Sequence, residues 1–159
     1  MTHHDQPPLE VSIDVAASPE RVWAEVSDRK AMARRSPELV GMWLVGGDKP
    51  GARGVNMNRR KAAVWPTTTK MLQVKPPTHD GSGVYSFRVG PSGVIWSYEI
   101  EPDGEGGTRL TERRSALTAP NGLVWGTAKF LLGGEDSHHG ELEAGMRTTL
   151  AAIKADAER

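Results

Sequence analysis

Two adjacent histidines among acidic residues are the first side chains of this sequence whose types and spacing could do chemistry. The stretch EDSHHGELEAGM, residues 135–146, contains His138 and His139 together with four acidic residues. A metal site needs three or four converging His or carboxylate ligands, which on a helix are commonly spaced i, i+3 or i, i+4. His138 with Glu141, and His139 with Glu143, have that spacing. The stretch could therefore be a metal site, a catalytic base or an ordinary helix start.

The helical pattern that follows argues against the metal site. At about 100° per residue, His139 falls inside the apolar stripe of the helix, whereas Glu141 and Glu143 fall on opposite flanks of it. That stripe contains Leu142, Met146, Thr149, Ile153 and Ala157. We therefore predict no metal, with the acids at 135–136 starting the helix at its positive end. The remaining chemical role is His139 as a donor or weak base toward a ligand at a cavity mouth.

A second set of charged candidates lies in the segment TRLTERRSA, residues 108–116. Side chains alternate faces along a strand, so Glu112 and Arg114 share the face of Leu110 if Leu110 points inward. Burying charges is costly unless each is matched and hydrogen-bonded. An inward pair therefore indicates either a ligand cavity or a rim position where water reaches both groups. Arg59, in an earlier strand pattern, raises the same question.

Two further strand patterns carry aromatic side chains on one face. In VYSFRV, Tyr85 and Phe87 share a face, and in VIWSYEI, Trp96 and Tyr98 do. Any one of these rings could simply fill the core, but buried Tyr hydroxyl and Trp indole groups need polar partners. Together they favour a pocket with some polarity. In VWPTTTKMLQV a proline and three threonines blur the alternation, so the inner face stays undecided, and Trp65 is the residue of this segment that we place toward such a pocket.

An apolar segment broken by glycines runs from Pro120 to Gly134 and carries Leu123, Trp125 and Phe130. Each glycine costs a helix roughly 1 kcal/mol relative to alanine. The segment could be a mobile flap over a cavity mouth, a self-association patch that would give a homodimer, or an ordinary packed connector.

The elements that must position these residues follow from the periodicity of the sequence. LEVSIDV alternates as a half-buried strand does. A short helix follows, with Ser18 as its cap and Pro19 in its first position, and a second short helix stops near Ser36, before a proline. Six short runs between residues 40 and 116, separated by Gly-, Pro- and Asp-rich turns, predict an antiparallel meander. With the long amphipathic helix at the end, this order predicts an α+β domain.

Length and charge exclude several classes of function. The 159 residues fit one domain, with residues 1–8 as a flexible arm and residues 9–159 as the folded part. Twenty basic and twenty acidic residues give zero net charge, which argues against a nucleic-acid binder. Without cysteine there is no thiol catalysis or thiolate metal site. No apolar run approaches the ~18 residues of a membrane span, and the start is polar, so we expect a soluble, cytoplasmic protein without stable membrane insertion.

The order of elements and several motifs resemble the START-domain-like (SRPBCC) superfamily, and within it the polyketide cyclase/dehydrase and lipid-transport branch. The motifs are ASPERVWAEVSD, SPEL, GARG…NRR…W, FRVG…WSYEIEP, GGTRLTE and GMRTTLAAIKADAE, which together cover almost the whole chain. The resemblance implies a helix-grip fold. In this fold a seven-stranded antiparallel sheet wraps around the long C-terminal helix, with two short helices after the first strand and a deep, mostly apolar cavity. The expected cavity residues are Trp65, Tyr85, Phe87, Trp96, Tyr98, Leu110, Glu112, Leu142 and Met146.

Three functions remain open, because one fold hosts many activities. The first is binding, and by extension transport, of a hydrophobic or aromatic small molecule, lipid or polyketide-like, without a cofactor. The second is a metal-free aromatase/cyclase or dehydratase, a lyase or isomerase that would use His139, Tyr98, Glu112 and Arg114 to move protons. The third is a protein-interaction module that uses the flap and a sheet edge.

Overall fold

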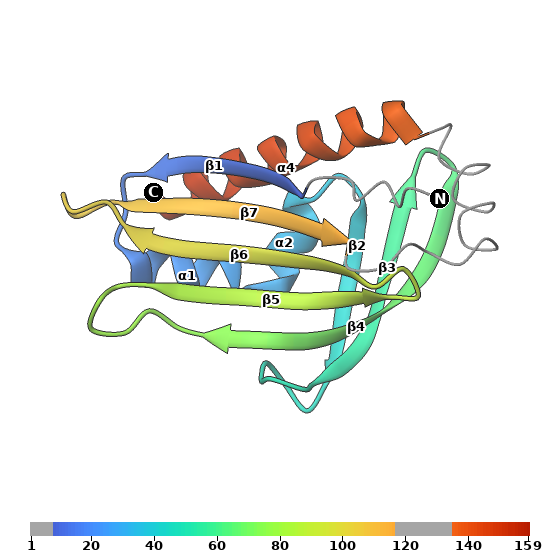
Figure 1. The fold of residues 1–159 in the computed structure, drawn as a ribbon, viewed down its shortest axis with the longest axis horizontal. Coiled ribbons are helices and arrows are strands. Elements are labelled where there is room, and N and C mark those ends of the chain that lie inside the picture. The colour runs from blue at the N-terminus through green and yellow to red at the C-terminus, as the bar shows by residue number, and fades with distance from the viewer. Residues whose placement is uncertain (1–7, 117–134) are drawn as a thin grey trace, which may run out of the picture.

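The computed structural model describes residues 8–116 and 135–159, which form one curved sheet, two short helices and a long C-terminal helix (Figure 1). The seven strands are antiparallel, in the order β1-β7-β6-β5-β4-β3-β2. They are β1 Leu9–Val15, β2 Leu39–Val45, β3 Arg53–Arg60, β4 Ala63–Lys75, β5 Gly83–Gly90, β6 Val94–Pro102 and β7 Thr108–Ala116. The helices are α1 Pro19–Val26, α2 Arg29–Arg35 and α4 Glu135–Ala157. The predicted α+β helix-grip fold is confirmed.

Two sequence predictions lie largely or wholly outside the described residues. The flexible arm was placed at residues 1–8, of which only residue 8 is described. The flap residues Leu123, Trp125 and Phe130 fall in the undescribed range 117–134. Within the described ranges, no helix is both long and apolar enough to cross a membrane.

The two short helices begin and end where their capping residues require. The Ser18 side chain accepts a hydrogen bond from the Arg21 amide at 3.2 Å, and Pro19 occupies the first turn, where its missing N–H costs nothing. Asp28 caps α2 in the same way through the Ala31 amide at 3.0 Å. Extended backbone at Ser36, the residue before a proline, ends α2 and directs the chain into β2.

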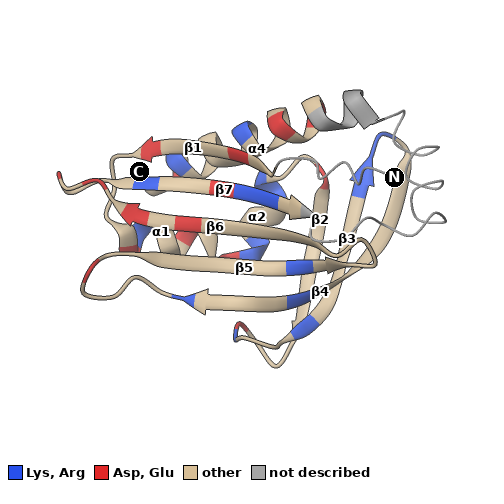
Figure 2. Ribbon diagram, viewed as in Figure 1, with Lys and Arg blue, Asp and Glu red and all other residues tan. Residues whose placement is uncertain are grey.

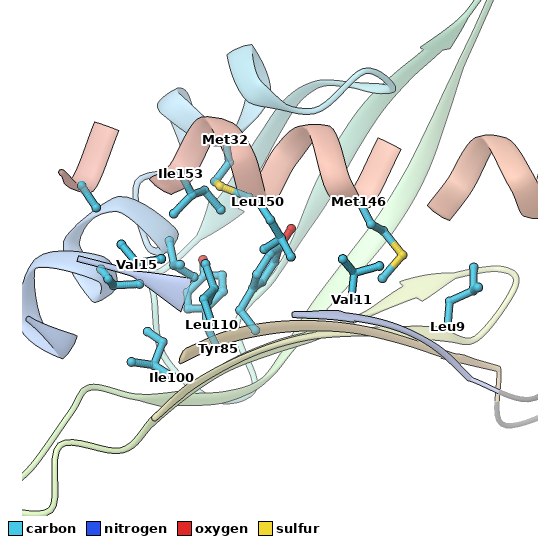
Figure 3. Packing of buried hydrophobic residues seen from close by; sticks show 14 of the residues in the cluster. Leu9, Val11, Val15, Met32, Tyr85, Ile100, Leu110, Met146, Leu150 and Ile153 are labelled. Atoms are coloured by element: carbon cyan, nitrogen blue, oxygen red, sulfur yellow. The ribbon is translucent and has the colours of Figure 1, made fainter. Parts of the chain in front are cut away.

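The core lies between the concave face of the sheet and the apolar stripe of α4 (Figure 3). Leu142, Met146 and Ile153 of that stripe are buried, as the 3.6-residue period predicts. They meet Val11 and Val15 of β1 and the fully buried residues of the central strands. Those central residues are Met71, Ile100 and Leu110.

A buried arginine joins all three helices near the C-terminal end of α4. Arg35 of α2 donates to Asp156 of α4 through Nε at 2.8 Å and to the Glu25 carbonyl of α1 through Nη1 at 2.9 Å. It also forms an ion pair with the Glu25 carboxylate. A buried charge is tolerated only with such full pairing, so Arg35 fixes how α1 and α2 sit against α4.

Candidate functional site

The central feature of the sheet's inner face is a buried acid beside a buried phenol. Glu112 of β7 and Tyr98 of β6 are direct cross-strand neighbours. The Tyr98 hydroxyl donates to Glu112 Oε1 at 3.0 Å, and Glu112 is only 3 % exposed. The other carboxyl oxygen, Oε2, is buried and has no hydrogen-bond partner within the described part of the chain. A polar atom in this condition is a candidate ligand contact.

Burial sets the protonation state of this pair. Loss of hydration raises the pKa of Glu112 to about 8, although the hydrogen bond from Tyr98 acts in the opposite direction. Burial, and then the neighbouring Glu112 carboxyl, raise the pKa of Tyr98 well above its ordinary value. At neutral pH both groups are therefore mostly protonated. A neutral Glu112 can donate a hydrogen bond from Oε2 while Oε1 accepts from Tyr98.

Aromatic side chains surround the pair on the neighbouring strands. Tyr85 of β5 lies directly opposite Tyr98, and Phe87 lies opposite Trp96. The Tyr85 ring packs edge-to-face against Trp23 of α1, with 5.9 Å between centroids. Tyr85 also donates to Asp48 at 2.9 Å, and Asp48 pairs with Arg29 of α2, so the polar end of Tyr85 is anchored beside this ion pair. The inner face thus combines large apolar area with a few fixed polar groups, as small-molecule sites do.

Four charged side chains gather at the end of the inner face where β7 ends and α4 begins. Arg60 of β3 forms an ion pair with Glu141 of α4. Burial raises the pKa of Glu38, while Arg60 and Arg114 act to lower it. Burial lowers the pKa of Arg114, whose guanidinium lies 6.0 Å from the centre of the Trp96 ring. Glu38, Arg60, Arg114 and Glu141 therefore form a partly desolvated cluster, here called the end cluster.

The inner face of β3 and β4 is polar, and it contains residues that the sequence patterns did not single out. Asn56 and Thr69 are both at most 3 % exposed. Asn56 Oδ1 and Thr69 Oγ1 have no hydrogen-bond partner in the described ranges. Beside them Asn58 donates to Thr67 Oγ1 at 3.0 Å. Thr67 and Thr69 of β4 therefore face inward and form a polar row with Asn56 and Asn58, whereas Thr68 between them is exposed.

The structure decides the two faces that the sequence left open. Trp65 shares the inner face of β4 with Thr69 and lies opposite Asn58. Arg59 is exposed, and its neighbour Arg60 is the inward residue, with a side chain only 10 % exposed. The even-numbered residues of β3 face inward, since polar Asn56 is buried whereas apolar Val55 is exposed. Apolar parity points to the wrong face when the inner face is polar.

The remaining predicted site residues divide between the interior and the undescribed ranges. Leu110, Leu142 and Met146 are buried in the core, and Arg114 shares the inner face of β7 with Glu112. The backbone at His139 is helical within α4, but the side chains of residues 135–139 lie outside the described set. The proposed role of His139 therefore stays a prediction. Across the described residues, no three His, Asp or Glu side chains come together as a metal site would require.

Most of the missed residues gave no usable signal in the sequence. Asn56 and Thr69 sit in polar stretches that resemble a solvated strand, and Glu38 precedes β2 in a turn. These three residues are recognised as site candidates only from the neighbours that they have in the folded protein. The TTT of residues 67–69 interrupts the alternation of apolar and polar residues, and this was the one available hint that polar side chains face inward here.

The sequence of residues 6–158 matches the family described as polyketide cyclase/dehydrase and lipid transport. Among curated proteins, none matches this sequence significantly.

Solved structures share the fold at low identity. The Zhui aromatase/cyclase from Streptomyces sp. R1128 superposes with a TM-score of 0.67 at 18% identity, over 96% of this chain and 94% of that one. The di-domain aromatase/cyclase StfQ from the steffimycin biosynthetic pathway gives 0.69 at 16% identity, over 95% of this chain and 50% of its own. The Polyketide_cyc-like protein Cgl2372 from Corynebacterium glutamicum gives 0.56 at 28% identity, over 92% and 88%.

Proposed function

Because the chain belongs to the polyketide cyclase/dehydrase and lipid-transport family, we propose that it binds a largely apolar small molecule between the sheet and α4. The molecule is aromatic, lipid-like or polyketide-like, and one of its oxygen atoms hydrogen-bonds to Glu112. Solved relatives of this fold include aromatase/cyclases, and the family description names lipid transport. Those descriptions belong to the relatives, and the residues of this chain carry the argument below.

The observation that carries the proposal is the buried Oε2 of Glu112, which has no partner in the described part of the chain. Leaving a buried polar group unsatisfied costs about 1–3 kcal/mol. A ligand oxygen that accepts a hydrogen bond from the neutral carboxyl would recover that cost. The unpartnered Asn56 Oδ1 and Thr69 Oγ1 offer two further polar contacts toward β3 and β4.

The aromatic inner face supplies the affinity that these polar groups alone would not. Phe87 and Trp96 are half-buried and lie opposite each other on β5 and β6, so their rings offer apolar area for contact. Tyr85 packs edge-to-face against Phe87, with 6.4 Å between centroids, and supports that ring. Arg114 of the end cluster lies over Trp96 and places a positive charge beside that ring, so a ligand with a negative or strongly polar tail is favoured at that end.

The test compares two probes that differ in one hydroxyl group, 2-naphthol and naphthalene. We expect the wild-type protein to bind 2-naphthol about tenfold more tightly, which corresponds to one buried hydrogen bond. In Glu112→Leu this preference disappears, whereas Glu112→Gln, which keeps a donor and an acceptor, retains most of it. Intrinsic tryptophan fluorescence reports binding, because Trp96 lies beside the site.

Glu101→Gln is the matched control, since Glu101 is an exposed carboxylate on β6. Circular dichroism melts of each variant separate misfolding from loss of binding. If neither probe binds the folded wild-type protein up to its solubility limit, and no small molecule is released from the purified protein on denaturation, the binding proposal is wrong.

A second function, aromatase/cyclase chemistry, is favoured by one specific feature. A carboxyl with a pKa of about 8 is protonated at neutral pH and can act as a general acid. Glu112 would protonate a ketone oxygen as the enol carbon of a methylene several positions along the chain attacks that carbonyl, forming the ring C–C bond. The enol proton is then released to the Glu112 carboxylate, which restores the neutral acid. The new hydroxyl then leaves as water together with a hydrogen from the adjacent carbon. No oxidant or reductant is needed.

Incubation with a synthetic poly-β-ketone thioester tests the catalytic function. We expect aromatic product to form faster than in buffer, and Glu112→Gln to lower that rate about 100-fold, the scale of a lost general acid. Equal rates with and without protein would leave only the binding function. The third function, a protein-interaction module, stays a prediction, as do the cytoplasmic location and the homodimer.

A further inference from the structure

The outer face of the sheet, which the ligand site does not use, carries an exposed apolar patch. Trp43 is 61 % exposed and Val45, on the same edge strand, is 81 % exposed. Trp43 lies directly opposite Val55 of β3. Folded proteins seldom expose apolar groups together unless the surface binds something. The patch, here called the outer patch, consists of Trp43, Val45, Val55 and Val64.

The orientation of Trp43 is fixed by the strand beneath it. A Cβ at Gly41 would lie 2.6 Å from Trp43 Cη2 and 2.9 Å from Cζ2, so the six-membered ring of the indole reaches over this glycine. A side chain at position 41 would displace the ring from this place. Most of the Trp43 side chain stays in solvent, since Trp43 is 61 % exposed.

Basic side chains border the outer patch, and no acidic residue occurs in the strands that form it. Arg53, Lys70 and Arg88 are cross-strand neighbours in one row over β3, β4 and β5 (Figure 2). Arg59, opposite Val64, borders the other side. All four are exposed, and none forms an ion pair with another described residue. The strands β2 to β5 contain no Asp or Glu at all.

We propose that this outer face docks on an anionic lipid bilayer. Indole and valine side chains enter the boundary between headgroups and acyl chains, where tryptophan is favoured. The basic row stays at the level of the phosphates, which attract Lys and Arg. The contact is peripheral, because a sheet face inserts side chains rather than a helix. It stands independently of the proposed ligand site, which faces the opposite side of the sheet.

A second copy of the chain fits this surface less well. A two-fold dimer through the outer patch would bring each basic row toward the other, and like charges across an interface are unfavourable. The net charge of the whole chain is zero, so the attraction to anions is local to this face.

Single-stranded nucleic acid is also disfavoured by the composition of the patch. Such surfaces use several aromatic rings on which successive bases stack. The outer patch has one indole and three valines, and valine offers no stacking surface. Its apolar content suits hydrocarbon better than bases.

The experiment measures binding of the full chain to vesicles by flotation, using pure phosphatidylcholine or phosphatidylcholine with about 30% phosphatidylglycerol. We expect binding only to the anionic vesicles. Replacing Arg53, Lys70 and Arg88 together by Gln should weaken it about 100-fold, at roughly fivefold per cation. Trp43→Ala should weaken it about tenfold, as expected for ~60 Å² of lost apolar contact.

The matched control replaces three exposed cations elsewhere, Lys30, Arg34 and Arg147, by Gln, which changes the net charge equally. This control should bind as wild type does. Three results overturn the proposal: equal loss in the control, which indicates a nonspecific charge effect; patch-dependent binding of a U20 RNA without vesicle binding; or sedimentation showing that Trp43→Ala dissociates a dimer that does not bind vesicles. Because no ligand is added, failure here leaves the ligand-binding proposal untouched.

Discussion

The two halves of the sheet, β1, β6 and β7 on one side and β2 to β5 on the other, differ in whether their outward cations are paired. On the outer face of β1, β6 and β7, cations are paired: Arg113 contacts Glu10 at 2.7 Å and Glu99 at 2.9 Å. On the outer face of β2 to β5, cations stand beside exposed apolar groups with no acid in the strands (Figure 2). The inner faces differ too: β1, β6 and β7 supply most of the buried apolar strand residues, whereas in β2 to β5 the polar residues Asn56 and Thr69 are buried beside apolar Met71 and Tyr85.

The strands β1, β6 and β7 and the strands β2 to β5 therefore differ in what covers them, although they form one continuous sheet. The half formed by β1, β6 and β7 is held by α1 and α4 and supplies most of the core. The half formed by β2 to β5 contributes Met71 and Tyr85 to the core, and its outer face carries the exposed apolar residues of the outer patch. The outer faces of the two halves therefore differ most, and substitutions in each half should show it.

The largest effect is expected from shortening a core residue of the first half. Leu110→Ala removes a fully buried side chain and should lower the free energy of unfolding by about 3 kcal/mol, since the cavity cannot collapse completely. Val64→Ala, at a position 58 % exposed in the second half, should change it by less than about 0.5 kcal/mol. Urea unfolding followed by circular dichroism measures both. Comparable losses would show that the outer face of β4 is covered and contributes to stability as the core does.

The next effect is a pH dependence that belongs to Glu112. Its pKa is raised to about 8 in the folded protein, above the ~4.3 of an unfolded chain. Between these values the folded state holds a proton that the unfolded state has lost. The contribution of Glu112 to the free energy of unfolding is therefore fully present below about pH 4.3. It is lost as pH rises toward 8, by at most about 1.4 kcal/mol per pH unit.

Glu112→Gln should remove this slope and leave a protein that is less sensitive to pH between 5 and 8. Urea midpoints at several pH values give the comparison, with Glu101→Gln as the exposed control on the same sheet. A slope that persists unchanged in Glu112→Gln would mean that another group causes it.

The smallest effect concerns the paired outer face of the first half. Arg113→Met breaks two solvent-exposed ion pairs and should cost at most about 1 kcal/mol, because water and salt screen such pairs. Lys70→Met, which breaks no ion pair with a described residue, should cost close to nothing. The difference should shrink at high salt in thermal melts. If Lys70→Met proves the more costly change, the outer charges of the two halves do not differ as described.

Several parts of the site were accessible from sequence because they follow a simple period. Glu112 was identified from its spacing to Leu110, and the aromatic faces of β5 and β6 from alternation alone. The stripe of α4 placed Leu142 and Met146 in the interior through the helical repeat. In each case an apolar residue marks the buried side, so the pattern points in the correct direction.

The end cluster could not be found in the same way. Glu38, Arg60, Arg114 and Glu141 come from four separated segments, and none of them repeats at a period that predicts the others. Their proximity depends on how β3 curves toward α4 and on where β7 ends. Charge pairing between distant segments arises only when the backbone folds, since the local sequence does not indicate which distant residue will lie beside a given charge.

By itself, the sequence determined the order of the elements, the cap of the first short helix and the gripped helix, and it tied the orientation of Glu112 to that of Leu110. These depend on contacts between near neighbours along the chain, where side-chain period and backbone geometry act directly. The tertiary structure decided that Arg60 rather than Arg59 turns inward, that Trp43 lies over Gly41 on an uncovered face, and that Glu112 keeps a carboxyl oxygen unpaired. Those outcomes depend on strand register and burial, which exist only once distant segments have packed together.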